Sequence, residues 1–373
     1  MFNNINLANM VFDGISRSIS VTPKLCSKIK HKASPCTICY TACPVQAIKV
    51  GGPGQTINVD WDACTGCGIC VSQCPSQVFK LRHGGYKKYI DNMCKSIDNR
   101  GNLKLVCGEY TGFSAKAAVL DCIGMITSLD ILVLYLKGAS KIEIRYGNCG
   151  DCESKHGKAV LDVEMKNLEQ LSQIFEDLND IEIVYESDGV KINFTKQYEI
   201  DRPIEDEKPN PEVNRRGMFS YFGKQLKDAA LKSADMLTAE TVESHTNIEF
   251  THEITARRQI FIDTIMQLGR ITKREVNTGM LFNNMEIDES CIYCGMCARF
   301  CGTGALTINE SRTELYFNAS KCISCGLCEK SCYHDKLHYL PTLDLKHFFD
   351  DRILVTRNPN GPKYPTDNVN IDL

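Results

Sequence analysis

Residues 64–75 read CTGCGICVSQCP, and this stretch decides how the chain folds. Its four cysteines follow the spacing C-x2-C-x2-C-x3-C and are closed by a proline. Residues 291–301 and 322–332 repeat the spacing, and residues 36–44 carry an incomplete copy, CTICYTACP. The two motifs of each pair lie 31 residues apart. The chain therefore contains two paired units, one toward each end.

Cysteines at this spacing offer thiolates to iron–sulfur clusters. Three cysteines at steps of three in a tight loop bind one cube, while the fourth, a helical turn further on, points to the neighbouring cube. A glycine follows the second cysteine of each complete motif, where the missing Cβ lets the backbone approach the cluster and direct N–H groups at sulfur. These glycines are Gly68, Gly295 and Gly326. Short hairpins are predicted between paired motifs. Their strands are Ala47–Val50 with Thr56–Val59 and Ala305–Ile308 with Thr313–Phe317.

These segments resemble bacterial two-cluster ferredoxins, over about residues 26–85 and 286–340. The resemblance implies a dicluster ferredoxin-like fold near both ends and four [4Fe–4S] clusters. Each cluster would take three cysteines from one motif and the fourth cysteine of the partner motif. The implied ligand sets are Cys64, Cys67, Cys70 with Cys43; Cys36, Cys39, Cys74 with one further ligand; Cys291, Cys294, Cys297 with Cys332; and Cys322, Cys325, Cys328 with Cys301.

The chain lacks one cysteine ligand and two prolines of the ferredoxin pattern. Ala33 occupies the first-ligand position of the N-terminal motif, and Gly302 and Tyr333 replace proline after the fourth cysteines. Cys26 is the nearest spare thiol, and a loop of nine residues could return it to the vacant corner. If Cys26 is instead an ordinary buried or free thiol, this centre would be a three-iron or solvent-ligated cluster. Structural zinc is the alternative at the motifs, but zinc has no use for a third cysteine at the next step of three.

The middle of the chain predicts a small α/β domain with a mostly parallel sheet, because short β-rich runs alternate with helical patterns. Ligands gather beyond the carboxyl ends of the strands in such sheets. Cys107, Cys122 and Cys149 each follow a predicted strand, and Cys152 completes a C-x2-C pair with Cys149. We therefore expect four thiols at one rim of the sheet, the edge formed by the carboxyl ends of its parallel strands. The predicted strands are Leu103–Val106, Ala117–Leu120, Lys141–Arg145 and Ile181–Tyr185, and the predicted helices are Thr127–Leu136 and Lys158–Leu178.

The stretch DCIGMITSLDILVLYLKGASKIEIRYGNCGDC, residues 121–152, also looks like the delta subunit of methyl-viologen-reducing hydrogenases. That subunit is an iron–sulfur protein that relays electrons toward heterodisulfide reductase. The resemblance implies a fifth centre, a [2Fe–2S] cluster, at the four central cysteines. Competing interpretations are structural zinc, a redox-active dithiol at Cys149 and Cys152, or plain core cysteines. Cys94 is expected to be a packing thiol.

Composition predicts a cytoplasmic protein with reduced thiols. The 373 residues carry a formal charge of −3, so no attraction to nucleic acid is expected. The start of the chain lacks a basic segment followed by an unbroken apolar core, which argues against a secretion signal. The most apolar stretch, Ala117–Leu136, contains Asp121 and Asp130, which argues against a transmembrane segment. The 21 cysteines therefore point to metal binding and not to disulfides.

We expect an α+β fold in five segments. They are an N-terminal dicluster ferredoxin domain at 1–92, an α/β domain with a cysteine-ligated site at 93–200, a linker and helical connector at 201–285, a C-terminal dicluster ferredoxin domain at 286–340, and an extended tail at 341–373. Within the connector, Arg202–Asn214 is proline-rich and charged, and helical periodicity follows at Met218–Glu243 and Glu253–Ile271. The tail is rich in Asn, Asp and Pro and has little to bury.

Clusters held entirely by cysteine have no open coordination site, so they exchange electrons and bind no substrate. The chain shows no dinucleotide, P-loop, H-E-x-x-H or radical-SAM pattern. We therefore expect a non-catalytic electron-transfer subunit of an anaerobic oxidoreductase complex, in which two ferredoxin units flank a third redox domain. The expected partners are a hydrogenase, a formate or aldehyde dehydrogenase, or a flavoprotein related to heterodisulfide reductase. The alternatives are a thiol–disulfide reductase whose clusters feed Cys149 and Cys152, and a zinc-stabilised scaffold.

Overall fold

The computed structural model describes residues 19–51, 56–82, 85–110, 116–186, 191–193, 252–268, 271 and 273–356. These residues belong to one compact unit, formed by Met1–Gln197 and Ile248–Leu373. The expected linker Arg202–Asn214 and the expected helix Met218–Glu243 lie outside the described residues.

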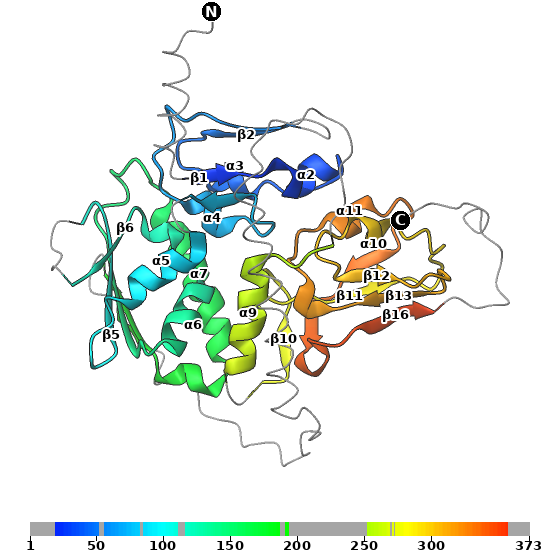
Figure 1. Ribbon diagram of the computed structural model, residues 1–373. Coiled ribbons are helices and arrows are strands. Elements are labelled where there is room, and N and C mark those ends of the chain that lie inside the picture. Colours follow the sequence, from blue (N-terminus) through cyan, green and yellow to red (C-terminus); the bar gives the residue numbers. More distant parts are fainter. Residues whose placement is uncertain are drawn as a thin grey trace, which may run out of the picture. The chain divides into compact units, whose positions relative to one another are not determined.

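The N-terminal module, residues 19–82, consists of two antiparallel strand pairs and short helices (Figure 1). The outer pair joins β1 (Ile19–Val21) to β4 (Phe79–Leu81). The inner pair joins β2 (Ile48–Val50) to β3 (Ile57–Val59), which confirms the first predicted hairpin. The helices are η1 (Pro23–Leu25), α2 (Ser27–Lys30), α3 (Ile38–Ala42) and α4 (Ile69–Gln73). A small apolar core that includes Ile48, Ile57 and Phe79 holds the two pairs together.

The C-terminal module, residues 273–356, repeats this plan. Its outer pair joins β11 (Met285–Ile287) to β14 (Leu337–Tyr339), and its hairpin joins β12 (Leu306–Ile308) to β13 (Glu314–Phe317). The hairpin is the second one that the sequence predicts. The helices are α10 (Met296–Phe300), η4 (Ala319–Lys321) and α11 (Leu327–Ser331). The repeated cysteine spacing thus produces the same local fold twice.

The segment after residue 340 differs from the extended tail that its composition predicts. β15 (Thr342–Asp344) pairs with β10 (Glu275–Asn277), and β16 (Arg352–Thr356) pairs with β13. Between them, η5 (Leu345–His347) leads to Phe348, which is buried with its ring centroid 5.4 Å from that of Phe282. The Asn and Pro residues that dominate the composition lie mainly in residues 357–373, outside the described part. Residues 341–356 therefore belong to the C-terminal module.

The central domain, residues 85–193, holds a five-stranded sheet in the order β6-β5-β7-β8-β9. The first four strands are parallel, which confirms the predicted sheet, and β9 runs antiparallel to β8. The strands are β5 (Asn102–Cys107), β6 (Ala118–Leu120), β7 (Lys141–Arg145), β8 (Glu182–Glu186) and β9 (Lys191–Asn193). The helices are α5 (Gly85–Cys94), η2 (Ile123–Met125), α6 (Ser128–Leu136), α7 (Gly157–Ser172) and η3 (Glu176–Asp180).

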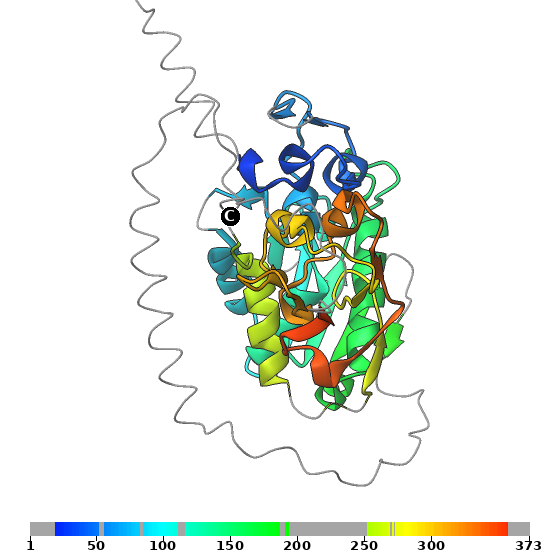
Figure 2. The ribbon, with the colours of Figure 1, turned by 90° about the vertical axis from the view of Figure 1, so that its right-hand side faces the viewer.

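The helices of the central domain cover one face of its sheet. The strands lie to one side of α5, α6 and α7 in Figure 1, and the sheet lies behind the helices in the turned view of Figure 2. Leu103 and Ile142 are fully buried on the covered face. The opposite face is charged, and Lys104 Nζ lies 3.2 Å from a carboxylate oxygen of Glu143. Since the strands run parallel, their carboxyl ends share one rim.

Buried polar contacts join the central domain to the N-terminal module. Glu164 of α7 is buried, and one of its oxygens accepts hydrogen bonds from the Ser128 backbone N–H at 2.9 Å and from the Ser128 hydroxyl at 3.0 Å. The other oxygen accepts a hydrogen bond from the Gln73 side chain at 3.1 Å. A carboxylate whose two oxygens are both hydrogen-bonded is stable in the interior, so it fixes α4, α6 and α7 relative to one another.

Helix α9 joins the N-terminal module to the C-terminal module. It spans Ala256–Gln267, within the expected helical stretch Glu253–Ile271. Arg257 donates a hydrogen bond to the Ser72 carbonyl of the N-terminal module. Arg258 is buried and donates three hydrogen bonds to carbonyls of the C-terminal module, at Leu281, Ala319 and Ser320. Among the helices that the structure describes, none has both the length and the apolar composition needed to cross a bilayer.

Candidate metal centres

The glycine after the second cysteine starts a helix in every complete motif. Gly68, Gly295 and Gly326 have φ of 73°, 74° and 70°, and they cap α4, α10 and α11. Side chains with a Cβ disfavour this left-handed conformation, which accounts for glycine at the position. The turn places the third cysteine in the first helical turn and the fourth cysteine just after the helix end, as Cys70 and Cys74 show for α4.

The fourth cysteine of every motif, including the incomplete one, accepts a backbone hydrogen bond. The donor N–H lies four or five residues further on, at a nitrogen-to-sulfur distance between 3.3 and 3.4 Å. The pairs are Ala47 with Cys43, Val78 with Cys74, Leu306 with Cys301, and Lys336 with Cys332. Such bonds stabilise negative charge on sulfur and tune the potential of a cluster bound there.

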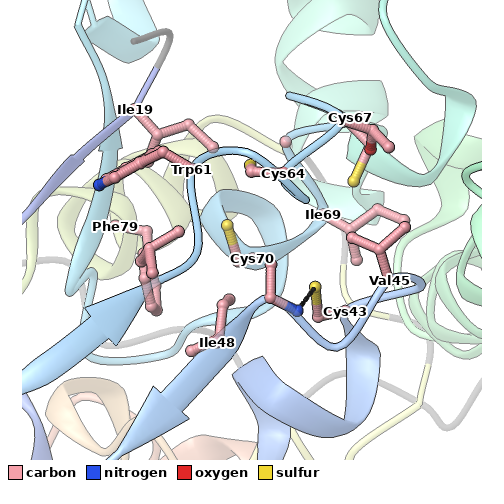
Figure 3. Close-up of a pocket in the computed structure, with 14 residues that line it drawn as sticks. Ile19, Cys43, Val45, Ile48, Trp61, Cys64, Cys67, Ile69, Cys70 and Phe79 are labelled. Carbon is pink, nitrogen blue, oxygen red and sulfur yellow. Dashed lines mark hydrogen bonds between the residues drawn. The ribbon is translucent and has the colours of Figure 1, made fainter. Parts of the chain in front are cut away.

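Four thiols of the N-terminal module line one apolar cavity (Figure 3). They belong to Cys43, Cys64, Cys67 and Cys70, which is the first predicted ligand set. Trp61 and Phe79 contribute to the walls. Burial raises the pKa of Cys70, and the three other thiols of the set raise it further.

The thiols of the second predicted set also lie near one another, and the Cys26 thiol lies near them. Burial raises the pKa of the Cys39 thiol to about 12, with further contributions from the thiols of Cys74, Cys36 and Cys26. Cys26 is buried, and its pKa is raised by burial and by the nearby Cys36. Cys26 lies directly before α2, and its role as the ligand that Ala33 cannot supply stays a prediction.

The C-terminal module gathers the two remaining ferredoxin-type sets. Cys301, Cys322, Cys325 and Cys328 line a cavity, and the Tyr339 hydroxyl lies 3.6 Å from Cys328 Sγ. Burial raises the pKa of Cys322 to about 12, with contributions from Cys301 and Cys325. In the other set, burial raises the pKa of Cys297, and three neighbouring thiols add to the rise. They belong to Cys291, Cys294 and Cys332.

The four central cysteines lie near one another at the carboxyl rim of the parallel sheet. Cys107 ends β5, and Cys122 follows β6. Burial raises the pKa of Cys122 to about 12, and the thiols of Cys67, Cys149 and Cys152 contribute. Burial also raises the pKa of Cys149, with contributions from Cys107 and Cys152. All four central thiols therefore lie within electrostatic reach of a neighbour in the set.

Close packing at the start of α7 fixes Cys122. A Cβ on Gly157 would lie 2.5 Å from Cys122 Sγ, so only glycine fits there. Sequence reasoning missed Thr65 and Ser154, whose hydroxyls lie 3.2 Å apart beside Cys67 and lower its pKa against the stronger effect of burial. The available signal was the position of Ser154, two residues after Cys152.

The chemistry of these donor sets fits iron–sulfur clusters. All 21 cysteines are free thiols, and the sets combine soft sulfur donors with apolar walls and N–H groups directed at sulfur. At least one thiol of every set, such as Cys70 or Cys122, has its pKa raised by burial and by neighbouring thiols, and the positive charge of an iron–sulfur core would favour its thiolate form. Within the described residues, no three His, Cys, Asp or Glu side chains form a site for a single metal ion. Cys94 lies outside the five sets and packs against the central core, as expected.

Family models match both modules. A model described as a 4Fe-4S dicluster domain matches residues 34–79, and another with the same description matches residues 290–336. Both ends of the chain carry 4Fe-4S dicluster ferredoxin domains. A 4Fe-4S single cluster model matches residues 57–102, and a search of curated proteins found no match. The ferredoxin domains give the chain an iron–sulfur electron-transfer role. These matches do not reach Cys107, so the likeness of the central domain to a hydrogenase delta subunit stays a prediction.

Proposed function

We propose that this chain is the multi-cluster electron-transfer subunit of an anaerobic oxidoreductase complex. Four [4Fe–4S] clusters would occupy the four cysteine sets of the ferredoxin domains, and a fifth centre, [2Fe–2S], would occupy the central set. The observation that carries the proposal is that each set supplies four thiols. With every iron ligated by cysteine and sulfide, such clusters have no free coordination site, so they transfer electrons and leave substrate chemistry to another subunit.

The proposed partners are a catalytic subunit and a second carrier. A hydrogenase, a formate or aldehyde dehydrogenase, or a flavoprotein related to heterodisulfide reductase would supply or accept the electrons. The support is the resemblance of the central domain to the delta subunit of methyl-viologen-reducing hydrogenases, together with a cysteine set at the rim of that domain. A co-purification from the native anaerobic cells, identified by mass spectrometry, would show a flavoprotein or a molybdenum, tungsten or hydrogenase subunit. Recovery of the chain alone would contradict this part of the proposal.

Stoichiometric reduction tests the electron-transfer function itself. Anaerobically purified chain is titrated with dithionite while its visible absorption is followed. Four cubes accept about four electrons and a [2Fe–2S] centre about one more, since each such cluster cycles by one electron. Reoxidation by an electron acceptor should restore the spectrum. A colourless protein, or one that takes up no reversible electrons, would overturn the proposal.

A dithiol enzyme is the second candidate, because the thiols of Cys149 and Cys152 lie near each other at the rim. Cys152→Ser separates the two functions. In a disulfide reductase the substitution abolishes disulfide reduction. In an electron carrier it removes one spectroscopic centre and leaves the four cubes intact.

A further inference from the structure

The two ferredoxin domains meet through the loop that follows α2. The His31 ring lies against the Phe300 ring, with their centroids 4.4 Å apart. A Cβ on Gly326 would lie 3.2 Å from Cγ of Pro35. Cys36 and Cys325, which belong to different ferredoxin domains, are close enough for the first to raise the pKa of the second. A cysteine set of one domain is therefore adjacent to a cysteine set of the other.

Lys30 places a buried amine at this junction. Its residue is only 9% exposed, and a Cβ on Gly302 would lie 3.0 Å from the Lys30 Nζ. Gly302 is one of the two positions where the chain lacks the usual proline, so the departure from the motif leaves room for the amine. Buried lysines ordinarily have a carboxylate partner. Among the described residues, no ion pair joins Lys30 to a carboxylate.

Three thiols lie within electrostatic reach of the amine instead. Burial lowers the pKa of Lys30, and the thiols of Cys325, Cys301 and Cys26 oppose that shift. Two of these belong to the C-terminal domain and one to the N-terminal domain. A second buried cation, Arg258, lies beside Cys322 of the same C-terminal set.

We propose that Lys30 sets the reduction potentials at the crossing between the two ferredoxin domains. The inference rests on the proposed electron-transfer function, and it assigns the ammonium group to the space between two cysteine sets. Reduction adds one negative charge to a cluster, and a nearby buried cation stabilises that charge, so it raises the potential. One electron leaves one cluster and enters the next, and no bond forms or breaks at Lys30. Lys30 is a positioning residue, since it contributes a fixed charge and binds no iron.

The same contacts place four of the five cysteine sets in order along one path. The central set is adjacent to the set containing Cys67, through Cys122. Cys70 of that set is adjacent to Cys39 of the second N-terminal set. Cys36 of the second set is in turn adjacent to Cys325 of the C-terminal domain. The central site therefore lies at one end of the path, and not between the two ferredoxin domains as their order in the sequence predicts. An electron that crosses between the two ferredoxin domains on this path passes Lys30.

A charge-removing substitution in the full chain tests the role of Lys30. Lys30→Met keeps the length of the side chain, and Lys32→Met is the matched control because it removes an exposed charge two residues further along the chain. Midpoint potentials are measured by anaerobic redox titration followed by electron paramagnetic resonance, beside iron and labile sulfide content. In Lys30→Met, the equilibrium constant for reduction of at least one cluster should fall about tenfold, which lowers its midpoint potential by about 59 mV for one electron. The iron content and the Lys32→Met potentials should match the wild type.

Gly302→Ala provides a second variant that keeps the charge. Its Cβ would lie 3.0 Å from Nζ, so the amine must move by a few tenths of an ångström and the potential of the same cluster should shift. Unchanged potentials in Lys30→Met would overturn the proposal. If Lys30→Met binds less iron than the wild type, the test rests on Gly302→Ala. Unchanged potentials in Gly302→Ala would then overturn the proposal. A wild-type chain without iron would instead refute the proposed function, which the iron assay detects separately.

Discussion

Cys26→Ala is the sharpest test of how the N-terminal ferredoxin domain completes its clusters. The motif lacks a cysteine at Ala33, and the structure places the buried Cys26 next to Cys36 and Cys39. We expect Cys26 to bind the fourth iron of this cube. Its removal should leave three cysteine ligands and convert the cube into a three-iron cluster.

We expect Cys26→Ala to lower the iron content only slightly and to change the electron paramagnetic resonance spectrum clearly. Four cubes hold about 16 irons, and the substitution removes about one of them. Loss of one buried sulfur costs about 1 kcal/mol of transfer free energy, so the fold should survive. Oxidised protein should then show a new paramagnetic signal of about one spin per chain, because a three-iron cluster has an odd electron count when oxidised.

Cys94→Ala is the matched control, since Cys94 lies outside the five cysteine sets. It should leave both the iron content and the spectrum unchanged. The reasoning about Cys26 is refuted if Cys26→Ala matches this control. It is equally refuted if the wild type already shows the three-iron signal, because the cluster would then lack a cysteine at the fourth corner.

Two further substitutions test the fold that positions the clusters, by anaerobic urea unfolding of each full-length variant. Gly68→Ala should lower the free energy of unfolding by about 2–4 kcal/mol for two reasons. Alanine disfavours the left-handed φ of this position, and its Cβ would lie 2.6 Å from Met125 Sδ. Gly85→Ala, at φ 60° with open space around it, should cost only about 1–2 kcal/mol, and equal losses would contradict the close approach. Phe348→Ala should cost about 3–5 kcal/mol because the ring is fully buried in the C-terminal module. Phe349→Ala, at a residue that is 44% exposed, should cost under about 1 kcal/mol of unfolding free energy. A loss that small in Phe348→Ala would contradict the packing of residues 341–356 into the C-terminal module and favour the extended tail.

The local structure of the ferredoxin domains follows from short-range rules. Cysteine steps of three and a glycine at Gly68 or Gly295 specify a left-handed turn and a helix within a few residues, so the sequence predicts them directly. The central rim is predictable for a related reason. Parallel strands end at one edge, so cysteines that follow β5, β6 and β7 meet there whatever the details of the crossovers.

Long-range contacts are the part that sequence reasoning could not provide. Nothing in the spacing of Lys30 and Gly302 shows that residues so far apart in the chain come within contact. The pairing of β16 with β13 was missed because the apolar residues of 343–355 were averaged with the polar composition that follows them. The order of the cysteine sets depends on how the domains pack, which is set by side chains such as Arg258 and Glu164 and not by any motif.

The central claim is that the paired cysteine motifs hold iron–sulfur cubes. Iron and labile sulfide counted on the full chain purified without oxygen test it most directly. Four cubes predict about 16 irons and 16 sulfides per chain, and a [2Fe–2S] centre at the central set raises both to about 18. Zinc in place of iron, or iron without labile sulfide, would contradict it.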